Sequence, residues 1–433
     1  MPPSVATTFP THQRRCGWNA LLAPRAPTPP LRGRVDCALA VIGAGYTGLA
    51  AARTFAESRP DSPVVLLDAD VLGEGSPGRN SGFMLEIALA DDADAGAVAR
   101  MAAVNRRTRE TMDWLRALAA QSGADCDLVR AGTYRGAATV GGMAGLDHYR
   151  AFLEAAGLEH RVLDREAMAA RIGTRHYLGG LWSPDCSLVQ PAALVRALAS
   201  VLPEGVALHE RSPALALWRI AGGWCVTTPD GEVRAERVVL ANNAFAASLG
   251  YGGARLVPIY TYAGLTPRLD GADLAALGDD PCWGLLPAHR LGTTLRRTVD
   301  GRLLVRSFYG YRREADNGAV EVALQGCMAR RYPVLAGVGL EHVWGGTTGL
   351  TRNGAPVWGE SAPGLWVSAG CNGGGVVKGS LLGRALVQTM LGGPADDVRT
   401  LFGTATWMPP EPLRALGFEL LTRRWRREAG AEV

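Results

Sequence analysis

Lysine is almost absent from this chain of 433 residues. Only Lys378 is a lysine, and the other 44 of the 45 basic residues are arginines. Because arginine keeps its charge at physiological pH, it cannot serve as a proton acceptor in a reaction. Any reaction that needs a lysine as base or nucleophile therefore depends on one residue.

Several other features are missing, and each absence argues against a class of protein. The net charge is +4 without a long basic run, so we expect no nucleic acid and no membrane as partner. No apolar run reaches the roughly 18 to 20 residues that span a bilayer. The eight cysteines form no C-x-x-C pair and the seven histidines are scattered. We expect a cytoplasmic protein with reduced thiols and no metal site.

The composition is that of a globular protein. Hydrophobic residues make up 47% and charged residues 20%, and 433 residues exceed one ordinary core, so we expect two domains. Residues 1–34 are rich in proline and arginine, which predicts an extended arm. After the arm, "LAVIG" from Leu39 and "SPVVLLDAD" predict buried parallel strands, and "GLAAARTFAES" between them predicts a helix.

Three glycines stand where the first of these strands meets the helix. Gly43, Gly45 and Gly48 form the pattern G-x-G-x-x-G. These glycines permit a tight turn, close approach of the backbone to a pyrophosphate, and close packing of helix on strand. Asp68 ends the second strand 20 residues after Gly48, where a carboxylate that binds a ribose is expected. This context predicts a dinucleotide site, with an accidental strand–turn–helix as the alternative.

The stretch "GEGSPGRNSGFM" at residues 73–84 favours FAD over NAD. It contains four glycines and small or polar residues around Arg79, where an NAD-binding domain would ordinarily continue into a helix. Such a segment suits backbone pressed against a flavin and its phosphates, and Arg79 is placed to pair with the pyrophosphate. An ordinary loop is the alternative.

A second glycine cluster lies near the other end of the chain, in "SAGCNGGGVVKGSLLG" at residues 368–383. A buried strand ends there, and three glycines from Gly373 precede a helix that begins near Val376. A helix N-terminus stabilises negative charge by about 0.3 to 1 kcal/mol, which suits a reduced flavin ring. We expect Cys371 and Asn372 beside that ring, and a plain turn is the alternative.

Five stretches together resemble a known family. In order, "VIGAGYTGLAAA", "VVLLDAD", "GSPGRNSGFM", "RVVLANNAFA" and "GLWVSAGCNGGGV" resemble the D-amino-acid-oxidase-like FAD-dependent oxidoreductases, over residues 16–392. The Pro-rich arm and the G-R-N-x-G segment are most similar to the gamma-glutamylputrescine oxidoreductase group, beside the sarcosine oxidase and glycine oxidase groups. The resemblance implies FAD and oxidation of a small amine or amino acid.

The resemblance also implies a fold and its boundaries. We expect an α/β chain with a Rossmann-like FAD-binding domain around a parallel sheet, and an α+β substrate domain with a large mixed or antiparallel sheet over the flavin. The expected parts are the arm at 1–34, the FAD-binding domain at 35–115, 165–250 and 340–392, the substrate domain at 116–164 and 251–339, and a helical tail at 393–433.

The cofactor-binding residues are carried over motif by motif. The ADP half is expected at Gly43, Gly45, Gly48 and Asp68, with Ala214 at the adenine, and further cofactor contacts are expected at Tyr46, Thr47 and Ala69. The ribityl chain and flavin are expected at Ser76, Arg79, Asn80 and Ser81. The remaining contacts, including the pyrimidine edge of the flavin, are expected at Ala241, Asn242, Gly370, Cys371, Asn372, Gly373, Gly374, Gly375 and Val376.

Two departures from the family bear on the chemistry. The sarcosine oxidase branch attaches FAD through a cysteine just before T-x-x-x-x-P, but here that region reads "WGGTTGLTRNGAP", so we expect non-covalent FAD. That branch also holds a lysine over the ring to activate oxygen. The matching strand here reads "RLLVRSFYGY", with Arg306 as the nearest cation. The electron acceptor is therefore either molecular oxygen or another molecule, and the sequence leaves both open.

The substrate is expected to bind beneath the second domain. Aromatic rings attract an amine, and arginines bind an anionic group. On this basis we expect substrate contacts at Arg306, Tyr260, Tyr262, Arg296, Tyr309 and Trp344, with ordinary packing as the alternative for each. A flavin monooxygenase would carry a G-D segment where this chain reads "SAGCNGGGV", and a non-catalytic flavin-binding protein is the other alternative.

Overall fold

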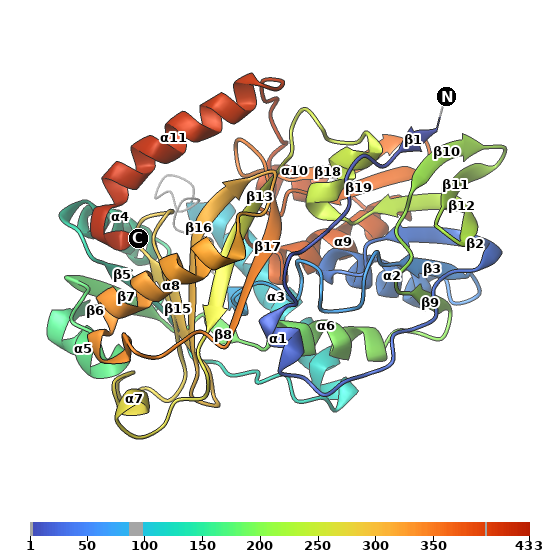
Figure 1. Ribbon diagram of the computed structural model, residues 1–433. Coiled ribbons are helices and arrows are strands. Elements are labelled where there is room, and N and C mark those ends of the chain that lie inside the picture. Colours follow the sequence, from blue (N-terminus) through green and yellow to red (C-terminus); the bar gives the residue numbers. More distant parts are fainter. Residues whose placement is uncertain (1–2, 86–97, 395) are drawn as a thin grey trace.

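The computed structural model describes residues 3–85, 98–394 and 396–433, and in these ranges two large sheets lie side by side (Figure 1). One sheet has nine strands and the other has eight. A two-stranded ribbon of β4 (Phe83–Leu85) and β8 (Cys186–Leu188) forms a third, small sheet.

The nine-stranded sheet carries the predicted βαβ unit. Its strands are β1 (Ser4–Val5), β2 (Gly33–Ile42), β3 (Val64–Leu67), β9 (Val206–His209), β10 (Ala216–Ile220), β11 (Gly223–Thr227), β12 (Gly231–Leu240), β18 (Val357–Ala362) and β19 (Leu365–Ala369). The order is β1-β10-β11-β12-β2-β3-β9, with β19 beside β12 and β18 beside β19. The pairs β12–β2, β2–β3, β3–β9 and β12–β19 are parallel. Parallel strands bury both faces, which is why β3 reads as an unbroken apolar run.

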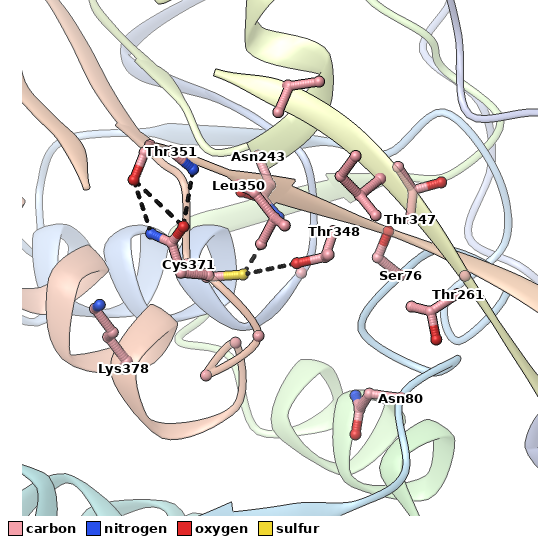
Figure 2. A pocket seen from close by; sticks show the side chains of 18 of the residues that line it. Ser76, Asn80, Asn243, Thr261, Thr347, Thr348, Leu350, Thr351, Cys371 and Lys378 are labelled. Carbon is pink, nitrogen blue, oxygen red and sulfur yellow. Dashed lines mark hydrogen bonds between the residues drawn. The ribbon is translucent and has the colours of Figure 1, made fainter. Parts of the chain in front are cut away.

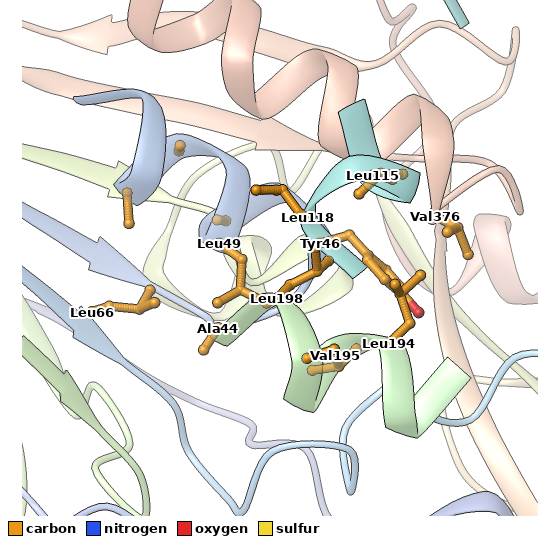
Figure 3. Packing of buried hydrophobic residues seen from close by; sticks show 14 of the residues in the cluster. Ala44, Tyr46, Leu49, Leu66, Leu115, Leu118, Leu194, Val195, Leu198 and Val376 are labelled. Atoms are coloured by element: carbon orange, nitrogen blue, oxygen red, sulfur yellow. The ribbon is translucent and has the colours of Figure 1, made fainter. Parts of the chain in front are cut away.

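Helices cover this sheet. They include α2 (Tyr46–Ser58), α3 (Val98–Ser122), α6 (Pro191–Ser200) and α9 (Val377–Met390). α9 lies directly against α2, because Gly383 has no side chain: a Cβ there would lie 2.2 Å from the carbonyl oxygen of Thr47. Figure 3 shows the apolar core between α2, α3 and α6, which contains Tyr46, Leu49, Leu115, Leu118, Leu194 and Leu198.

The eight-stranded sheet is mixed but mostly antiparallel. Its strands are β5 (Thr133–Ala137), β6 (Arg161–Asp164), β7 (Gly179–Ser183), β13 (Val257–Leu265), β14 (Trp283–Pro287), β15 (Thr294–Arg297), β16 (Leu303–Tyr311) and β17 (His342–Leu350). The order is β17-β13-β16-β15-β14-β5-β7-β6, and only β14–β5 is parallel. The helices of this half are α4 (Val140–Ala155), α5 (Arg165–Ile172), α7 (Gly271–Ala275) and α8 (Asn317–Arg331).

The N-terminal arm and the C-terminal tail both join the two halves. The arm pairs β1 with β10, contains the short helix α1 (Gly17–Ala20), and buries Trp18 against Trp344 of β17. The tail contains α10 (Asp396–Phe402) and α11 (Leu413–Ala429), and Figure 1 shows α11 beside the eight-stranded sheet. At the end of the tail, the buried carboxylate of Glu432 accepts hydrogen bonds from the backbone N–H groups of Ala138 and Thr139.

The predicted fold class is confirmed, since a parallel-centred sheet and a large mixed sheet are both present. The boundaries expected at residues 165 and 340 do not coincide with the change of sheet. β7 and β17 lie on the FAD-domain side of those boundaries, yet both are strands of the eight-stranded sheet. The chain crosses between the sheets without a change of composition, so the sequence held no signal for the crossing. Within the described residues, no helix is both long and apolar enough to cross a membrane.

Candidate functional site

A cavity of about 1290 Å³ lies between the two sheets and is lined by residues of both. This volume exceeds the roughly 300 to 1,000 Å³ of an ordinary small-molecule pocket. It therefore has room for a dinucleotide together with a small substrate. One end is formed by the glycine loop after β2, and the other by the face of the eight-stranded sheet and by α11.

The glycine loop leaves no space for side chains. At Gly43 the backbone φ is +105°, and a Cβ would lie 3.0 Å from the carbonyl oxygen of Ala241. At Gly48 a Cβ would lie 1.8 Å from the carbonyl oxygen of Gly43. The first glycine thus makes the turn and the third lets α2 pack beneath it. α2 begins with Gly45 as its N-cap and no capping side chain, so its first N–H groups face the cavity as hydrogen-bond donors.

Asp68 stands at the end of β3, beside this loop. One carboxylate oxygen accepts a hydrogen bond from the N–H of Ala44 at 2.9 Å, and the other from the N–H of Asp70 at 3.0 Å. Burial raises the pKa of Asp68 to about 6, although these two hydrogen bonds act to lower it. The carboxylate lines the cavity next to Ala69 and Ala214, where the hydroxyl groups of a ribose can donate to it.

The second glycine cluster also lines the cavity, through Cys371, Asn372 and the three glycines from Gly373. Asn372 has a φ of +52°, and its side chain accepts from the N–H of Thr351 and donates to the carbonyl oxygens of Gly354 and Gly370. Figure 2 shows the Cys371 thiol pointing toward Thr348, 3.7 Å from its hydroxyl oxygen. α9 follows with no capping side chain, so a second helix N-terminus meets the cavity.

Two buried polar atoms in the cavity wall have no hydrogen-bond partner among the described residues. They are Oδ1 of Asn242, after β12, and Oγ1 of Thr347, on β17. A buried polar atom without a partner costs about 1 to 3 kcal/mol, so such atoms in a cavity point to a bound group that satisfies them. The glycine cradle, the carboxylate, the two open helix termini and these two atoms together fit FAD.

Most of the expected cofactor residues meet in this cavity. Those that line it are Gly43, Gly45, Tyr46, Thr47, Asp68, Ala69, Ser76, Arg79, Asn80, Ser81, Ala214, Ala241, Asn242, Cys371, Asn372, Gly373, Gly374, Gly375 and Val376. Gly48 and Gly370 lie behind the wall instead. Gly48 serves the packing of α2, and the N–H of Gly370 is held by the side chain of Asn243 at 2.8 Å.

Arg79 lines the cavity, but its guanidinium group is engaged elsewhere. It donates to the carbonyl oxygens of Glu74, Gly345 and Arg14, and it pairs with the carboxylate of Glu74 at 3.3 Å. Its charge is therefore already compensated. In the structure Arg79 joins the 74–79 loop, the arm and β17, and its pairing with the pyrophosphate stays a prediction.

Three of the expected substrate residues reach the cavity. Arg306 donates from Nε to the hydroxyl of Thr261 at 2.6 Å and from Nη1 to the hydroxyl of Tyr309 at 2.9 Å. Its guanidinium also lies 4.9 Å from the ring centre of Tyr309. Tyr262 lines the cavity, and its hydroxyl accepts a hydrogen bond from the N–H of Ala315. These bonds hold Arg306 in one orientation over the cavity.

The other three expected substrate residues lie outside this cavity. Tyr260 faces a second cavity of about 870 Å³, next to His12 and Glu314. Arg296 is fully buried and donates to the carbonyl oxygens of Ser81 and Val189. Trp344 is fully buried and donates to the carbonyl oxygen of Arg79 at 3.1 Å. Arg296 and Trp344 thus support the backbone of the 79–81 loop from behind, and neither lines the cavity in which a substrate contact was expected of them.

Sequence reasoning missed several residues that line the cavity. They include Arg135, Thr261, Leu286, Thr294, Thr347, Phe418 and Trp425. Most lie on strands of the eight-stranded sheet whose neighbours are far apart in sequence, and the last two come from α11. A search for chemistry-bearing motifs could not find them, because only the pairing of the strands brings them together.

Comparison with known proteins agrees with this geometry. The family described as "DAO: FAD dependent oxidoreductase" matches residues 38–389. The chain is 28% identical to the probable oxidoreductase OrdL of Rhizobium meliloti, over 87% of this chain and 88% of that protein. It is 27% identical to gamma-glutamylputrescine oxidoreductase of Escherichia coli, over 85% and 86%.

Solved structures share the fold. The chain is similar to glycine oxidase from Geobacillus kaustophilus, with a TM-score of 0.70 and 20% identity, over 87% of this chain and 97% of that one. It is also similar to iminodiacetate oxidase from Chelativorans sp. BNC1, with a TM-score of 0.64 and 21% identity, over 83% and 96%.

Proposed function

Because the chain belongs to the DAO family of FAD-dependent oxidoreductases, we propose that it oxidises the carbon–nitrogen bond of a small amine or amino acid. The observation that carries this proposal is the continuity of the cavity. The cradle that fits FAD and the arginine-bearing face of the eight-stranded sheet belong to one space. The names of the relatives, gamma-glutamylputrescine oxidoreductase among them, support an amine or amino acid as the substrate.

Bound FAD would supply a hydride acceptor for the carbon next to the substrate nitrogen. With FAD bound, the substrate would lose a hydride and one proton to give an imine, which water would hydrolyse to a carbonyl compound and an amine or ammonia. The chain must therefore hold the substrate carbon toward the flavin and admit water afterwards. Arg306, fixed by Thr261 and Tyr309, is the group best placed to bind an anionic end of the substrate.

The amine must be neutral to give up a hydride, and the cavity favours the neutral form. Of the described residues that line it, only Asp68 is an acid, and Asp68 lies at the glycine-loop end. No described carboxylate is therefore available at the sheet face to stabilise an ammonium ion. Transfer of an ammonium ion into such an environment lowers its pKa, and a nearby arginine lowers it further. The substrate amine thus loses its proton without a dedicated catalytic base.

The choice of electron acceptor depends on which cation lies over the eight-stranded sheet. The single lysine does not lie on the eight-stranded sheet. Lys378 is on α9, where its Nζ donates to the carbonyl oxygen of Gly354 at 3.2 Å and lies 5.1 Å from the ring centre of Phe402. Over the sheet face the fixed cation is Arg306, which does not release a proton. We therefore propose that the reduced enzyme reacts slowly with oxygen. A dehydrogenase that passes its electrons to another acceptor is the alternative to an oxidase.

An anaerobic screen tests this function. The purified yellow protein is mixed with amines, amino acids and N-methyl amino acids, and the flavin absorbance is recorded before and after air is admitted. We expect a subset of these compounds to bleach the flavin directly. Bleaching by NAD(P)H but by none of the amines would indicate a monooxygenase, and no bleaching by any of them would indicate a binding protein. The rate at which colour returns in air then measures the reaction with oxygen.

A further inference from the structure

One row of residues runs across the eight-stranded sheet and faces the cavity. Arg135 of β5 is paired with Leu286 of β14, and Thr294 of β15 is paired with Arg306 of β16. Arg306 is in turn paired with Ala263 of β13. All five residues line the cavity. Residues directly opposite one another on paired strands share a face, so the row presents a cation, an apolar side chain, a hydroxyl and a second cation in sequence.

Arg135 stands at the outer end of this row, and no described residue gives it a compensating charge. Only 6% of it is exposed, and its guanidinium lies 4.3 Å from the ring centre of Tyr149. The described part of the chain contributes no hydrogen bond or ion pair to its guanidinium. A cation that is mostly buried is costly unless an anion or hydrogen-bond acceptor meets it. The ring contact holds the guanidinium group, and the residue lines the cavity, where an anion could meet it.

Arg306 stands at the inner end, closer to the residues that fit FAD. Nε and Nη1 are occupied by Thr261 and Tyr309, and these bonds leave Nη2 for a ligand. Figure 2 shows Thr261 near Ser76 and Thr347, which places this end of the row beside the expected flavin contacts. Three strand spacings separate Arg135 from Arg306, which is about 14 Å between their Cα atoms, and the long side chains shorten the gap between the two charges.

We infer that the substrate carries an anionic group at each end: a carboxylate on Arg306 beside the amine that is oxidised, and a second carboxylate or similar anion on Arg135, with a short aliphatic linker over Leu286 and Thr294. That an amine of this substrate is oxidised rests on the proposed function. That the substrate has two anionic groups rests only on the residues of the row. Planar carboxylates match the fork of the arginine side chain, and the apolar middle of the row matches a chain of methylene groups.

Titration calorimetry with unreactive acids tests the inference on the FAD-loaded protein. The ligands are linear dicarboxylates of increasing length, from malonate through glutarate to pimelate, and monocarboxylates of matching length. We expect dicarboxylates of intermediate length to bind at least about tenfold more tightly than the monocarboxylates, because a second charged hydrogen-bonded contact forms. Equal affinities across both series would overturn the inference.

Variants assign the second contact to Arg135. Arg135→Met should lower the affinity for the best dicarboxylate to that of its monocarboxylate, and should leave the affinity for monocarboxylates unchanged. The matched control is Arg161→Met, since Arg161 is on β6 of the same sheet and also lies over a ring, that of Trp182 at 5.1 Å, but does not line the cavity. If Arg135→Met loses its FAD, Arg135→Gln replaces it. An unchanged preference for dicarboxylates in a folded Arg135 variant would refute the assignment.

The calorimetry and the anaerobic screen can fail independently. A length-dependent preference for dicarboxylates without bleaching by any amine would keep the two-anion site and reject amine oxidation. Bleaching by simple amines and monocarboxylic amino acids, with no gain from a second carboxylate, would keep the proposed function and reject the two-anion site.

Discussion

The protonation of Asp68 is expected to control how tightly FAD binds at different pH values. Burial raises the pKa of this carboxyl group to about 6, while the N–H groups of Asp70 and Ala44 partly stabilise the ionised form. A ribose hydroxyl donates its hydrogen bond most strongly to an ionised carboxylate. The form of the protein that binds FAD best is therefore the one that has lost this proton.

The size of the effect follows from the pKa. With a pKa of about 6, the ionised fraction of Asp68 falls from about one half at pH 6 to about one tenth at pH 5, so the FAD dissociation constant should rise about fivefold over this range, which is about 1 kcal/mol. Above about pH 7 the dissociation constant should not change. The cofactor-free protein should respond in the opposite sense. Because the pKa is raised on folding, the carboxyl group stabilises the empty fold at low pH, and this contribution is lost as the pH rises through about 6.

Quenching of FAD fluorescence on titration with cofactor-free protein measures the dissociation constant across this range. The control is Asp68→Asn, which should bind FAD more weakly at neutral pH and show no dependence on pH between about pH 5 and pH 8. A flat profile in the wild-type protein, or the same slope in Asp68→Asn, would refute the reasoning.

Three further predictions concern the loops and the cation over the cavity. Gly48→Ala places a Cβ 1.8 Å from the carbonyl oxygen of Gly43, so it should lower the melting temperature and the FAD content, whereas Gly141→Ala, where a Cβ meets nothing within 4 Å, should do neither. Asn372→Gly should keep more FAD than Asn372→Ala in an absorbance assay. Both variants lose the side-chain hydrogen bonds of Asn372 to Thr351, Gly354 and Gly370, but only glycine accommodates a φ of +52° at low cost, and equal losses would contradict this. After photoreduction, Arg306→Lys should regain its colour in air faster than the wild-type protein, because lysine can exchange a proton, and an unchanged rate would show that this cation does not limit the reaction.

The nucleotide-binding end could be predicted from the sequence because its signals are local. Gly43, Gly45 and Gly48 lie within six residues, and Asp68 follows at a spacing set by one helix and one strand. Each of these residues is where the βαβ unit requires it. The second glycine cluster is local in the same way, since strand, turn and helix follow one another between β19 and α9.

The substrate end could not be predicted in the same way, because it depends on strand pairing between distant segments. A period of two along β13 would place Tyr260 and Tyr262 on one face. Both tyrosines belong to one apolar cluster, yet Tyr262 lines the main cavity while Tyr260 lines the second one. The irregularity at this point lies in the partner strand, since β16 carries an extra residue, Phe308 with a φ of +62°, opposite the step from Thr261 to Tyr262. Arg135 lies 171 residues before its row partner Arg306. No local pattern connects them.

Two arginines have hydrogen-bond partners that the sequence did not indicate. Arg79 and Arg296 lie near the cofactor loop, and an arginine there was expected to meet phosphate or substrate. In the fold, both guanidinium groups satisfy backbone carbonyl oxygens, those of Gly345 and Arg14 for Arg79 and those of Ser81 and Val189 for Arg296. Loop carbonyl groups that no strand pairs need donors, and arginine supplies several at once. The sequence does not show which carbonyl groups lack partners.

The most direct measurement is the visible spectrum of the purified protein before and after acid precipitation. The cavity is lined by both glycine clusters, which predicts a yellow protein with one FAD per chain. Because β17 has no cysteine, we expect acid precipitation to release all of this FAD into the supernatant. A colourless protein that takes up no FAD on reconstitution would contradict the account of the site. A pigment that stays with the precipitate would contradict non-covalent binding.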